Sequence, residues 1–134
     1  MATRERKSPR KRNTEHRPGS RTYTAPALQR VLTILGQQVP VYKIDFPDND
    51  RWGEWRPGYR EIHVDRNGYT SDRHEVEVNL HEITHAISDM NLSEKDRLTE
   101  PQVTTMAVGF ADLLANNPGL VKDMVRLLKQ NRRR

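Results

Sequence analysis

The stretch His81-Glu82-Ile83-Thr84-His85 constrains this chain most, because it places metal-binding and proton-accepting side chains within one predicted helix. Two histidines four residues apart lie one turn apart on a helix face, so both imidazoles can bind a single metal ion. A glutamate beside the first histidine can take a proton from a water on that metal. The pattern therefore predicts a hydrolytic metal site with His81 and His85 as ligands and Glu82 as general base.

The residues around this motif predict a continuous helix from about Ser71 to Met90, with Ser71 as N-cap and Asp72 in the first turn. Its spacing gives two stripes, one of Val76, Leu80, Ile83 and Ile87, and a second of His74, Val78, His81 and His85. A histidine pair beside a core-facing stripe is what the wall of a cleft requires. The alternative is a surface helix with two ordinary polar histidines. A chance match to the motif occurs in roughly one chain in a hundred of this composition, so its context has to decide.

Composition limits the protein to one domain with a small core. The chain has 134 residues, of which 34% are hydrophobic and 31% are charged, and it has no cysteine. A metal site must therefore use His, Asp or Glu, and disulfides are excluded. The sequence has no apolar run of membrane-spanning length and no signal-peptide core, which predicts a soluble, cytoplasmic protein without a membrane partner.

Charge divides the chain into an acidic middle and two basic ends. Residues 1–22 carry a net charge of +6, residues 122–134 carry +5, and residues 23–121 carry −6. Residues 1–22 contain only Met1 and Ala2 as apolar residues, which predicts a disordered tail. The predicted organisation is a basic tail over 1–22, one domain over 23–131, and a basic end over 132–134. The tails can make weak, non-specific contacts with nucleic acid, although a solubilising role is commoner.

Hydrophobic spacing predicts an α+β fold. Leu28, Val31, Leu32 and Leu35 follow a helical period, so an amphipathic helix is expected from Ala25 to Gln38, with Thr24 as N-cap. Short strands are expected at about 41–46, 52–56 and 59–64, in a small antiparallel sheet, with turns at 47–50 and Pro57-Gly58.

Two further helices are expected after the motif helix. The connection over 91–98 is polar and can hold one helical turn from Ser93. Thr99 and Gln102 form a capping box for a helix that ends near Asn116-Asn117-Pro118. Its expected buried residues are Val103, Met106, Ala107, Phe110, Leu113 and Leu114. A last helix over about 118–130 is expected to turn Leu120, Val121, Met124, Leu127 and Leu128 inward.

The order of these elements resembles the minimal core of the zincin metallopeptidases over roughly residues 25 to 117. The metzincin pattern requires a third histidine and a glycine where this chain has Asn91 and Ser88. No histidine follows His85, so a downstream third ligand must be Asp or Glu, which is similar to the gluzincin branch. Within that branch the chain resembles small H-E-x-x-H proteins encoded by tailed phages and, more loosely, the ImmA/IrrE group of repressor-cleaving peptidases. A phage origin would imply the cytoplasm of a bacterial host.

The resemblance implies a zinc-dependent peptidase that hydrolyses a protein or peptide substrate. Zn²⁺ would be held by His81, His85 and one carboxylate, with Glu82 as the base. The expected third ligand is Glu100, which begins a helix on the same stripe as Val103, Ala107 and Leu114, so that it faces the interior. Its rivals are Glu94 and Asp96, and its alternative role is to favour the positive end of its own helix from the surface.

Several neighbours are candidates for supporting roles. Asp89 can accept the second ring N–H of His85 or can be a solvated acid at the helix end. An oxyanion can be steadied by His74, Tyr59, His63 or Tyr69, although each is more often a packing or surface residue. In a zincin the strand before the motif helix lines the cleft and pairs with an extended substrate, and here that strand is about Glu61 to Val64.

Two other classes of function stay open at this level. The chain can be a nucleic-acid-associated module with a structural or vestigial metal site, or a peptidase fold that binds a host protein without cutting it. Retention of Glu82 favours catalysis, because a structural site has no use for a base. The oligomeric state does not follow from the sequence.

Overall fold

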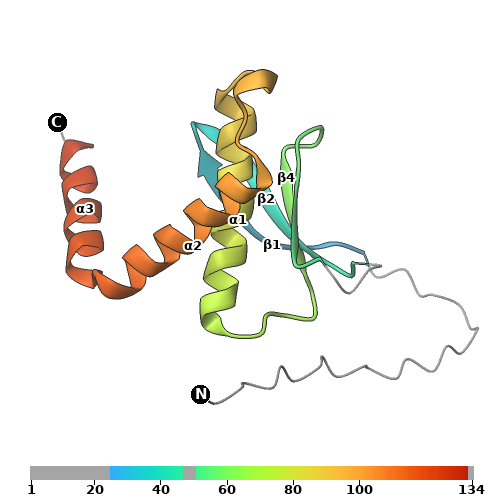
Figure 1. The fold of residues 1–134 in the computed structure, drawn as a ribbon, viewed down its shortest axis with the longest axis horizontal. Coiled ribbons are helices and arrows are strands. Elements are labelled where there is room, and N and C mark those ends of the chain that lie inside the picture. The colour runs from blue at the N-terminus through green and yellow to red at the C-terminus, as the bar shows by residue number, and fades with distance from the viewer. Residues whose placement is uncertain (1–24, 47–50, 133–134) are drawn as a thin grey trace, which may run out of the picture.

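The computed structural model describes residues 25–46 and 51–132 and confirms the α+β class. A four-stranded sheet is followed by three α-helices and one short 3₁₀ turn (Figure 1). The elements are β1 (Ala27–Ile34), β2 (Gln37–Ile44), β3 (Gly53–Arg56), β4 (Glu61–Asp65), α1 (Asp72–Asn91), η1 (Glu94–Asp96), α2 (Glu100–Asn116) and α3 (Pro118–Asn131). The expected tail at 1–22, the Thr24 cap and the turn at 47–50 lie outside the described residues.

The helix expected from Ala25 to Gln38 is wrong, because this stretch forms the antiparallel hairpin of β1 and β2. Its turn consists of Leu35 and Gly36, whose φ angles are 49° and 75°. Positive φ at both positions gives a two-residue turn whose twist matches that of the flanking strands.

Burial explains why strand pairing prevails over the helical spacing. The hairpin buries Ile34, Val39 and Val41 in the core, whereas Leu28, Val31 and Leu35 of the expected helical stripe are half exposed. β-Branched residues favour a pleated surface, and long-range pairing supplies the backbone hydrogen bonds that a helix would have made locally.

The sheet has the order β1-β2-β4-β3 and is mixed rather than antiparallel. β2 pairs with β4 in parallel, and β4 pairs antiparallel with β3, so that Trp55 lies opposite Ile62. β4 is therefore an inner strand, and β3 forms one edge of the described sheet. The two strands around Pro57-Gly58 begin and end within two residues of the expected positions.

The core lies between one face of the sheet and α1. Its buried members are Ile34, Val39, Val41, Trp55, Ile62, Val64 and Ala86. α2 crosses α1 on the side away from the sheet (Figure 1). α1 thus has a layer on either side, and this position determines which of its residues are buried.

The apolar stripe expected on α1 is only partly buried. Val76 and Ile87 are exposed, whereas Val78, Glu82, Thr84, Ala86 and Ser88 are buried. A helix packed against two layers buries two strips, and small or polar side chains occupy the positions where the neighbouring backbones approach most closely. The Ser71 N-cap is confirmed, since Ser71 Oγ accepts from the His74 backbone N–H at 3.1 Å.

The C-terminal helices form where expected, but their expected buried faces are largely wrong. The Thr99–Gln102 capping box of α2 and the short turn η1 are confirmed. On α2, Val103, Ala107 and Ala111 are buried, whereas Met106, Phe110, Leu113 and Leu114 are exposed. α3 has no buried residue, because it stands clear of the sheet and of α1 (Figure 1). Within the described ranges, no helix combines the length and apolar character needed to cross a membrane.

The β1–β2 turn predicts opposite effects for substitutions at its two positions. Gly36→Ala should destabilise the protein by about 1 kcal/mol, because alanine disfavours positive φ. No atom lies within 4 Å of the added Cβ, so the cost comes from the backbone alone. Leu35→Asn should stabilise by up to about 1 kcal/mol, since asparagine tolerates this conformation. Urea unfolding measures both changes, and equal shifts in the same direction would contradict the turn assignment.

Candidate metal centre

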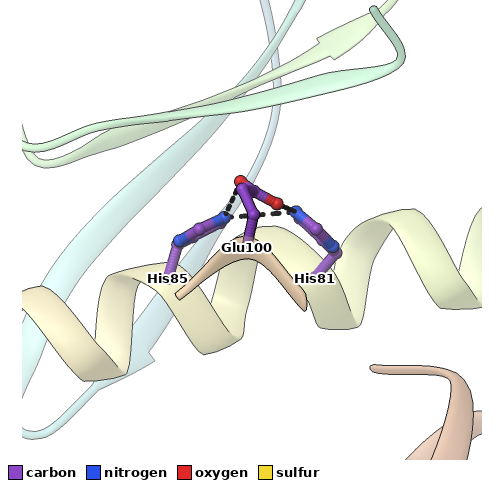
Figure 2. A group of neighbouring side chains, drawn as sticks. All are labelled: His81, His85 and Glu100. Carbon is purple, nitrogen blue, oxygen red and sulfur yellow. Dashed lines mark hydrogen bonds and ion pairs between the residues drawn. The ribbon is translucent and has the colours of Figure 1, made fainter. Parts of the chain in front are cut away.

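Three ligand-type side chains from two helices converge beside α1. His81 and His85 lie one turn apart on α1, and Glu100 is the first residue of α2 (Figure 2). Glu100 Oε2 lies 3.1 Å from His81 Nε2, and Glu100 Oε1 lies 2.7 Å from His85 Nε2. The two Nε2 atoms are 3.1 Å apart. Within the described residues this is the one group of three such side chains with a ligand atom each inside 4.8 Å.

The structure brings Glu100 to the histidine pair and keeps both rival acids away from it. Asp96 accepts a 2.7 Å hydrogen bond from Ser93 Oγ, and Glu94 is exposed in η1. The predicted inward orientation of the Glu100 side chain is wrong, however. Its side chain is 67% exposed, so it reaches the histidines from the rim of the site rather than from the interior.

The donor set and its spacing fit a zinc ion. Two imidazole nitrogens and one carboxylate oxygen are the ligands of many catalytic zinc sites. Ligand atoms at zinc bond lengths lie roughly 3.3 Å apart in a tetrahedron, close to the separations found here. Burial lowers the pKa of His81, and His85 lowers it further, while Glu100 raises it. The net shift favours the neutral imidazole, which is the form that binds metal.

Glu82 lies between this cluster and the sheet. Its side chain is buried, and it accepts a hydrogen bond from the Trp55 backbone. Burial is the main cause that raises the pKa of Glu82 to about 7. Gly53 makes this position possible, since a Cβ there would lie 2.9 Å from both Cγ and Oε1 of Glu82.

Two open hollows meet at His81 and Glu82. One, of about 430 Å³, is also lined by His85, Glu100, Asp89 and residues of β3. The other, of about 300 Å³, lies between α1, α2 and the start of β3, with Trp52 and Val78 among its apolar lining residues. The candidate ligands are therefore accessible from solvent along the β3 edge of the sheet, and the buried Glu82 borders the same hollows.

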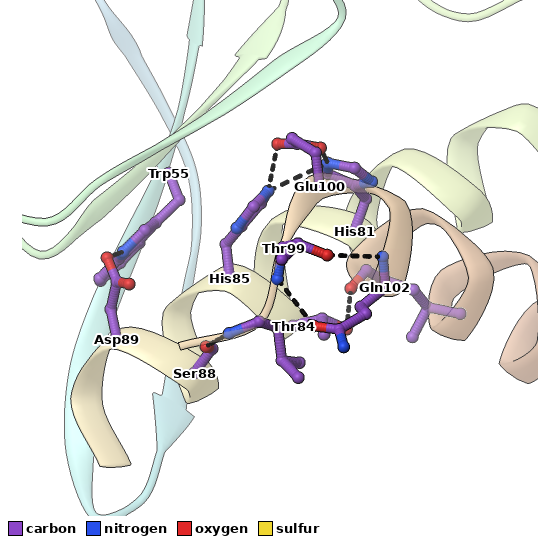
Figure 3. Close-up of polar contacts among 11 residues, drawn as sticks. Trp55, His81, Thr84, His85, Ser88, Asp89, Thr99, Glu100 and Gln102 are labelled. Carbon is purple, nitrogen blue, oxygen red and sulfur yellow. Dashed lines mark hydrogen bonds and ion pairs between the residues drawn. The ribbon is translucent and has the colours of Figure 1, made fainter. Parts of the chain in front are cut away.

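The connection between α1 and α2 places Glu100. Ser88, buried on α1, accepts a 2.9 Å hydrogen bond at Oγ from the Leu98 backbone N–H. At the start of α2, the Thr99 backbone N–H donates to Gln102 Oε1, and the Gln102 backbone N–H donates to Thr99 Oγ1. Figure 3 shows these contacts on the same side of α1 as the histidines. The hydrogen bond to Ser88 fixes Leu98 against α1. Because Leu98 lies two residues before Glu100, this contact also fixes the start of α2 relative to α1.

Asp89 faces Trp55 rather than His85 (Figure 3). Its Oδ2 accepts a 2.8 Å hydrogen bond from Trp55 Nε1, and its Oδ1 lies 3.3 Å from Arg97 Nε. Asp89 therefore ties the end of α1 to β3 and to the α1–α2 connection. This contact supports the walls of the site and replaces the expected contact with the His85 ring.

Of the oxyanion candidates, His74 borders a hollow beside His81 and Glu82. Its Nδ1 accepts from the Thr70 backbone N–H at 3.1 Å, so the neutral ring carries its proton on Nε2. Tyr69 packs edge-on against His74, and burial raises the pKa of its phenol.

Tyr59 and His63 are held away from the candidate ligands. Tyr59 is 70% exposed in the β3–β4 turn, with the Arg56 guanidinium 4.3 Å from its ring centroid. His63 alternates along β4 with the core residues Ile62 and Val64, so it faces the other side of the sheet. There it contacts Glu61 at 2.9 Å.

Three contributors to the site are missing from the sequence-based prediction: Gly53, Ser88 and Trp55. A glycine within a strand is a recognised sign of close backbone approach, so Gly53 could have been singled out. Ser88 and Trp55 carry no comparable signal, because their partners lie on other elements.

The comparisons with known proteins identify no relative. No family model, no curated protein sequence and no solved structure matches this chain. The candidate centre therefore rests on the geometry and chemistry of its own residues.

Because the Glu82 carboxyl is buried, we expect the stability difference between the wild type and the Glu82→Gln variant to depend on pH. The pKa of Glu82 rises from 4.5 to about 7 on folding. The native state thus binds more protons than the unfolded state in this window, and stability falls as pH rises through it. Glu82→Gln removes this loss, so in metal-free protein the variant should gain up to about 3 kcal/mol relative to wild type between pH 5 and pH 8. Urea unfolding in the presence of a chelator measures this gain.

The exposed residue Glu94 provides the control for this comparison. Glu94→Gln makes the same carboxylate-to-amide change at an exposed position, and this variant should keep the pH dependence of the wild type. A pH-independent effect of Glu82→Gln would show that the Glu82 carboxyl stays ionised in the native state.

Proposed function

We propose that this chain is a zinc-dependent metallopeptidase that hydrolyses a protein or peptide substrate. The observation that carries the proposal is the convergence of His81, His85 and Glu100 on an open hollow that the buried Glu82 also lines. The ligands come from two helices that the Ser88–Leu98 contact holds together. Such preorganisation of donors around an accessible position is what hydrolytic metal chemistry requires.

His81, His85 and Glu100 would hold the zinc ion, which when bound supplies a Lewis acid and makes a water acidic enough to lose its proton near neutral pH. Glu82 is placed to accept that proton and to return it to the leaving amine. Its carboxyl is largely desolvated and accepts one backbone hydrogen bond from Trp55, so its orientation is restricted. A carboxyl with a pKa near neutrality can both accept and donate a proton at physiological pH.

Strand β3 is the part of the sheet that suits an extended substrate. The strand expected to do so, about Glu61 to Val64, pairs on both sides and offers no free edge. β3 pairs only with β4 among the described strands, and its residues Gly53 and Trp55 line the hollow beside the ligands. An extended peptide that added to this edge would pass next to Glu82.

Catalysis accounts for the arrangement better than a structural metal site does. A structural site fills its four positions with protein ligands, whereas three converge here among the described residues, and they lie at solvent-accessible hollows. Burying the Glu82 carboxyl also costs stability, which a purely structural site would not require.

Metal content tests the ligand set. The purified protein should carry about one zinc ion per chain by elemental analysis, because the described residues contain one group of three zinc-type ligands. Glu100→Ala should lower zinc affinity by at least about tenfold, since the third ligand is lost. The matched control is Glu94→Ala, an exposed acid six residues earlier that has no contact with the histidines. A larger loss with Glu94→Ala, or a wild-type protein without zinc after supplementation, would contradict the assignment.

Hydrolysis tests the role of Glu82. Glu82→Gln should retain zinc and fold but lose peptide cleavage by at least about a hundredfold, because an amide cannot accept the proton. Cleavage of a proteome-derived peptide library, read by mass spectrometry, provides an assay that does not presuppose the substrate. Equal cleavage by wild type and variant would exclude Glu82 as the base, and zinc binding without any cleavage would favour a binding role for the site.

A further inference from the structure

A large apolar surface lies on the two C-terminal helices, away from the candidate metal centre. It is defined here as the C-terminal apolar face and consists of Met106, Phe110, Leu113, Leu114, Leu120, Met124, Leu127 and Leu128. The exposure of these residues ranges from 38% for Met106 to 65% for Leu128. Folded monomers rarely leave so many large apolar side chains uncovered in one region.

The spacing of this face is that of a helix packed against other helices. Met106, Phe110 and Leu113 on α2 are separated by four and then three residues, and Leu120, Met124 and Leu127 repeat this on α3. α2 is capped by Asn117, whose φ of −133° and ψ of 58° are not helical, so α3 turns away from α2 and each helix carries its own apolar stripe (Figure 1). Leu114 on α2 and Leu128 on α3 adjoin these stripes and widen them to those of a helical bundle.

α3 needs a partner that the described chain does not supply. It has 14 residues, none of them buried, and it stands clear of the sheet and of α1 (Figure 1). A helix of this length is marginal in water without packing against another element. Residues 1–22 hold Met1 and Ala2 as their only apolar residues, so their composition offers little apolar surface.

The charges around the face allow two identical faces to meet. Lys122, Arg126 and Lys129 lie on the opposite side of α3, as their spacing from Met124 requires. On the flank opposite Leu114 and Leu128, the corresponding positions hold Gly109 and Asn116 on α2 and Asp123 and Gln130 on α3, without a lysine or arginine. A second copy would therefore bring no cations together across the contact.

The area of the face also suits a dimer. Its eight side chains together expose on the order of 700 Å² of apolar surface, if a fully exposed side chain of this size presents roughly 200 Å². A stable interface buries about 800 Å² on each partner. Because the contact is dominated by apolar side chains, it has the composition of a permanent homodimer interface.

We propose that two copies of this chain associate through their C-terminal apolar faces, so that α2 and α3 of each copy pack together as a four-helix assembly. Glu100 lies at the N-terminal end of α2, before the face begins, so association leaves the candidate metal centre accessible. The proposal is independent of the proposed peptidase activity.

The mass of the full chain in solution tests this proposal. Light scattering coupled to gel filtration at micromolar concentration should give twice the chain mass of 15.6 kDa. Met124→Glu should weaken association by at least about tenfold, because it buries an unpaired charge in the contact. The matched control is the neighbouring Val125→Glu, which adds the same charge at similar exposure outside the face, 44% against 50%, and should remain dimeric.

Each other outcome overturns the proposal. A wild-type chain that stays monomeric would exclude the dimer, whether or not any variant folds. A monomer that sediments with phosphatidylglycerol vesicles would assign the face to a lipid surface instead. If both glutamate variants were dimeric, or both monomeric with wild-type circular dichroism, the contact would lie elsewhere.

Discussion

The packing of α1 between two layers is the constraint on which the rest of this structure depends. The helix presents Ala86 and Glu82 toward the sheet, and its Thr84 and Ser88 are buried as well. The histidine pair is left between these two strips, at the partly exposed rim. The sheet buries the Glu82 carboxyl and makes it difficult to ionise, and the second layer, formed by α2, brings Glu100 to the histidines.

The two ends of α2 contribute to different parts of the protein. Its first residue, Glu100, meets the histidines, and its position follows from the anchor between Ser88 and Leu98. Its buried positions Val103, Ala107 and Ala111 pack close to the body of the domain, where small side chains allow a short distance between helices. From Met106 onward a second strip faces away from that body. The proposed metal chemistry and the proposed self-association therefore use opposite ends of one helix without sharing a residue.

The errors in the sequence-based prediction have a common physical origin. Over residues 25–38 the apolar residues fit a helical period, but the hydrogen-bond partners are in β2, and only the turn residue Gly36 marks the hairpin locally. For α3 the amphipathic pattern was read correctly, yet its apolar side has no partner within the described chain. Hydrophobic periodicity indicates that one face of an element must be buried, but it does not indicate which other element buries that face. The zincin resemblance assigns substrate pairing to about Glu61 to Val64, but the order of the strands makes this stretch an inner strand.

The sequence by itself determined the contacts between residues that lie close together in the chain. The one-turn spacing of His81 and His85, the Ser71 cap and the Thr99–Gln102 capping box depend on residues within four positions of one another, so helix geometry alone fixes them. The tertiary structure decided everything that joins distant segments. It placed Glu82 beneath Gly53, Asp89 against Trp55, and Glu100 at a distance of 2.7 Å from His85. These contacts depend on how close two layers can pack, which is set by the volumes and hydrogen bonds of residues far apart in the chain.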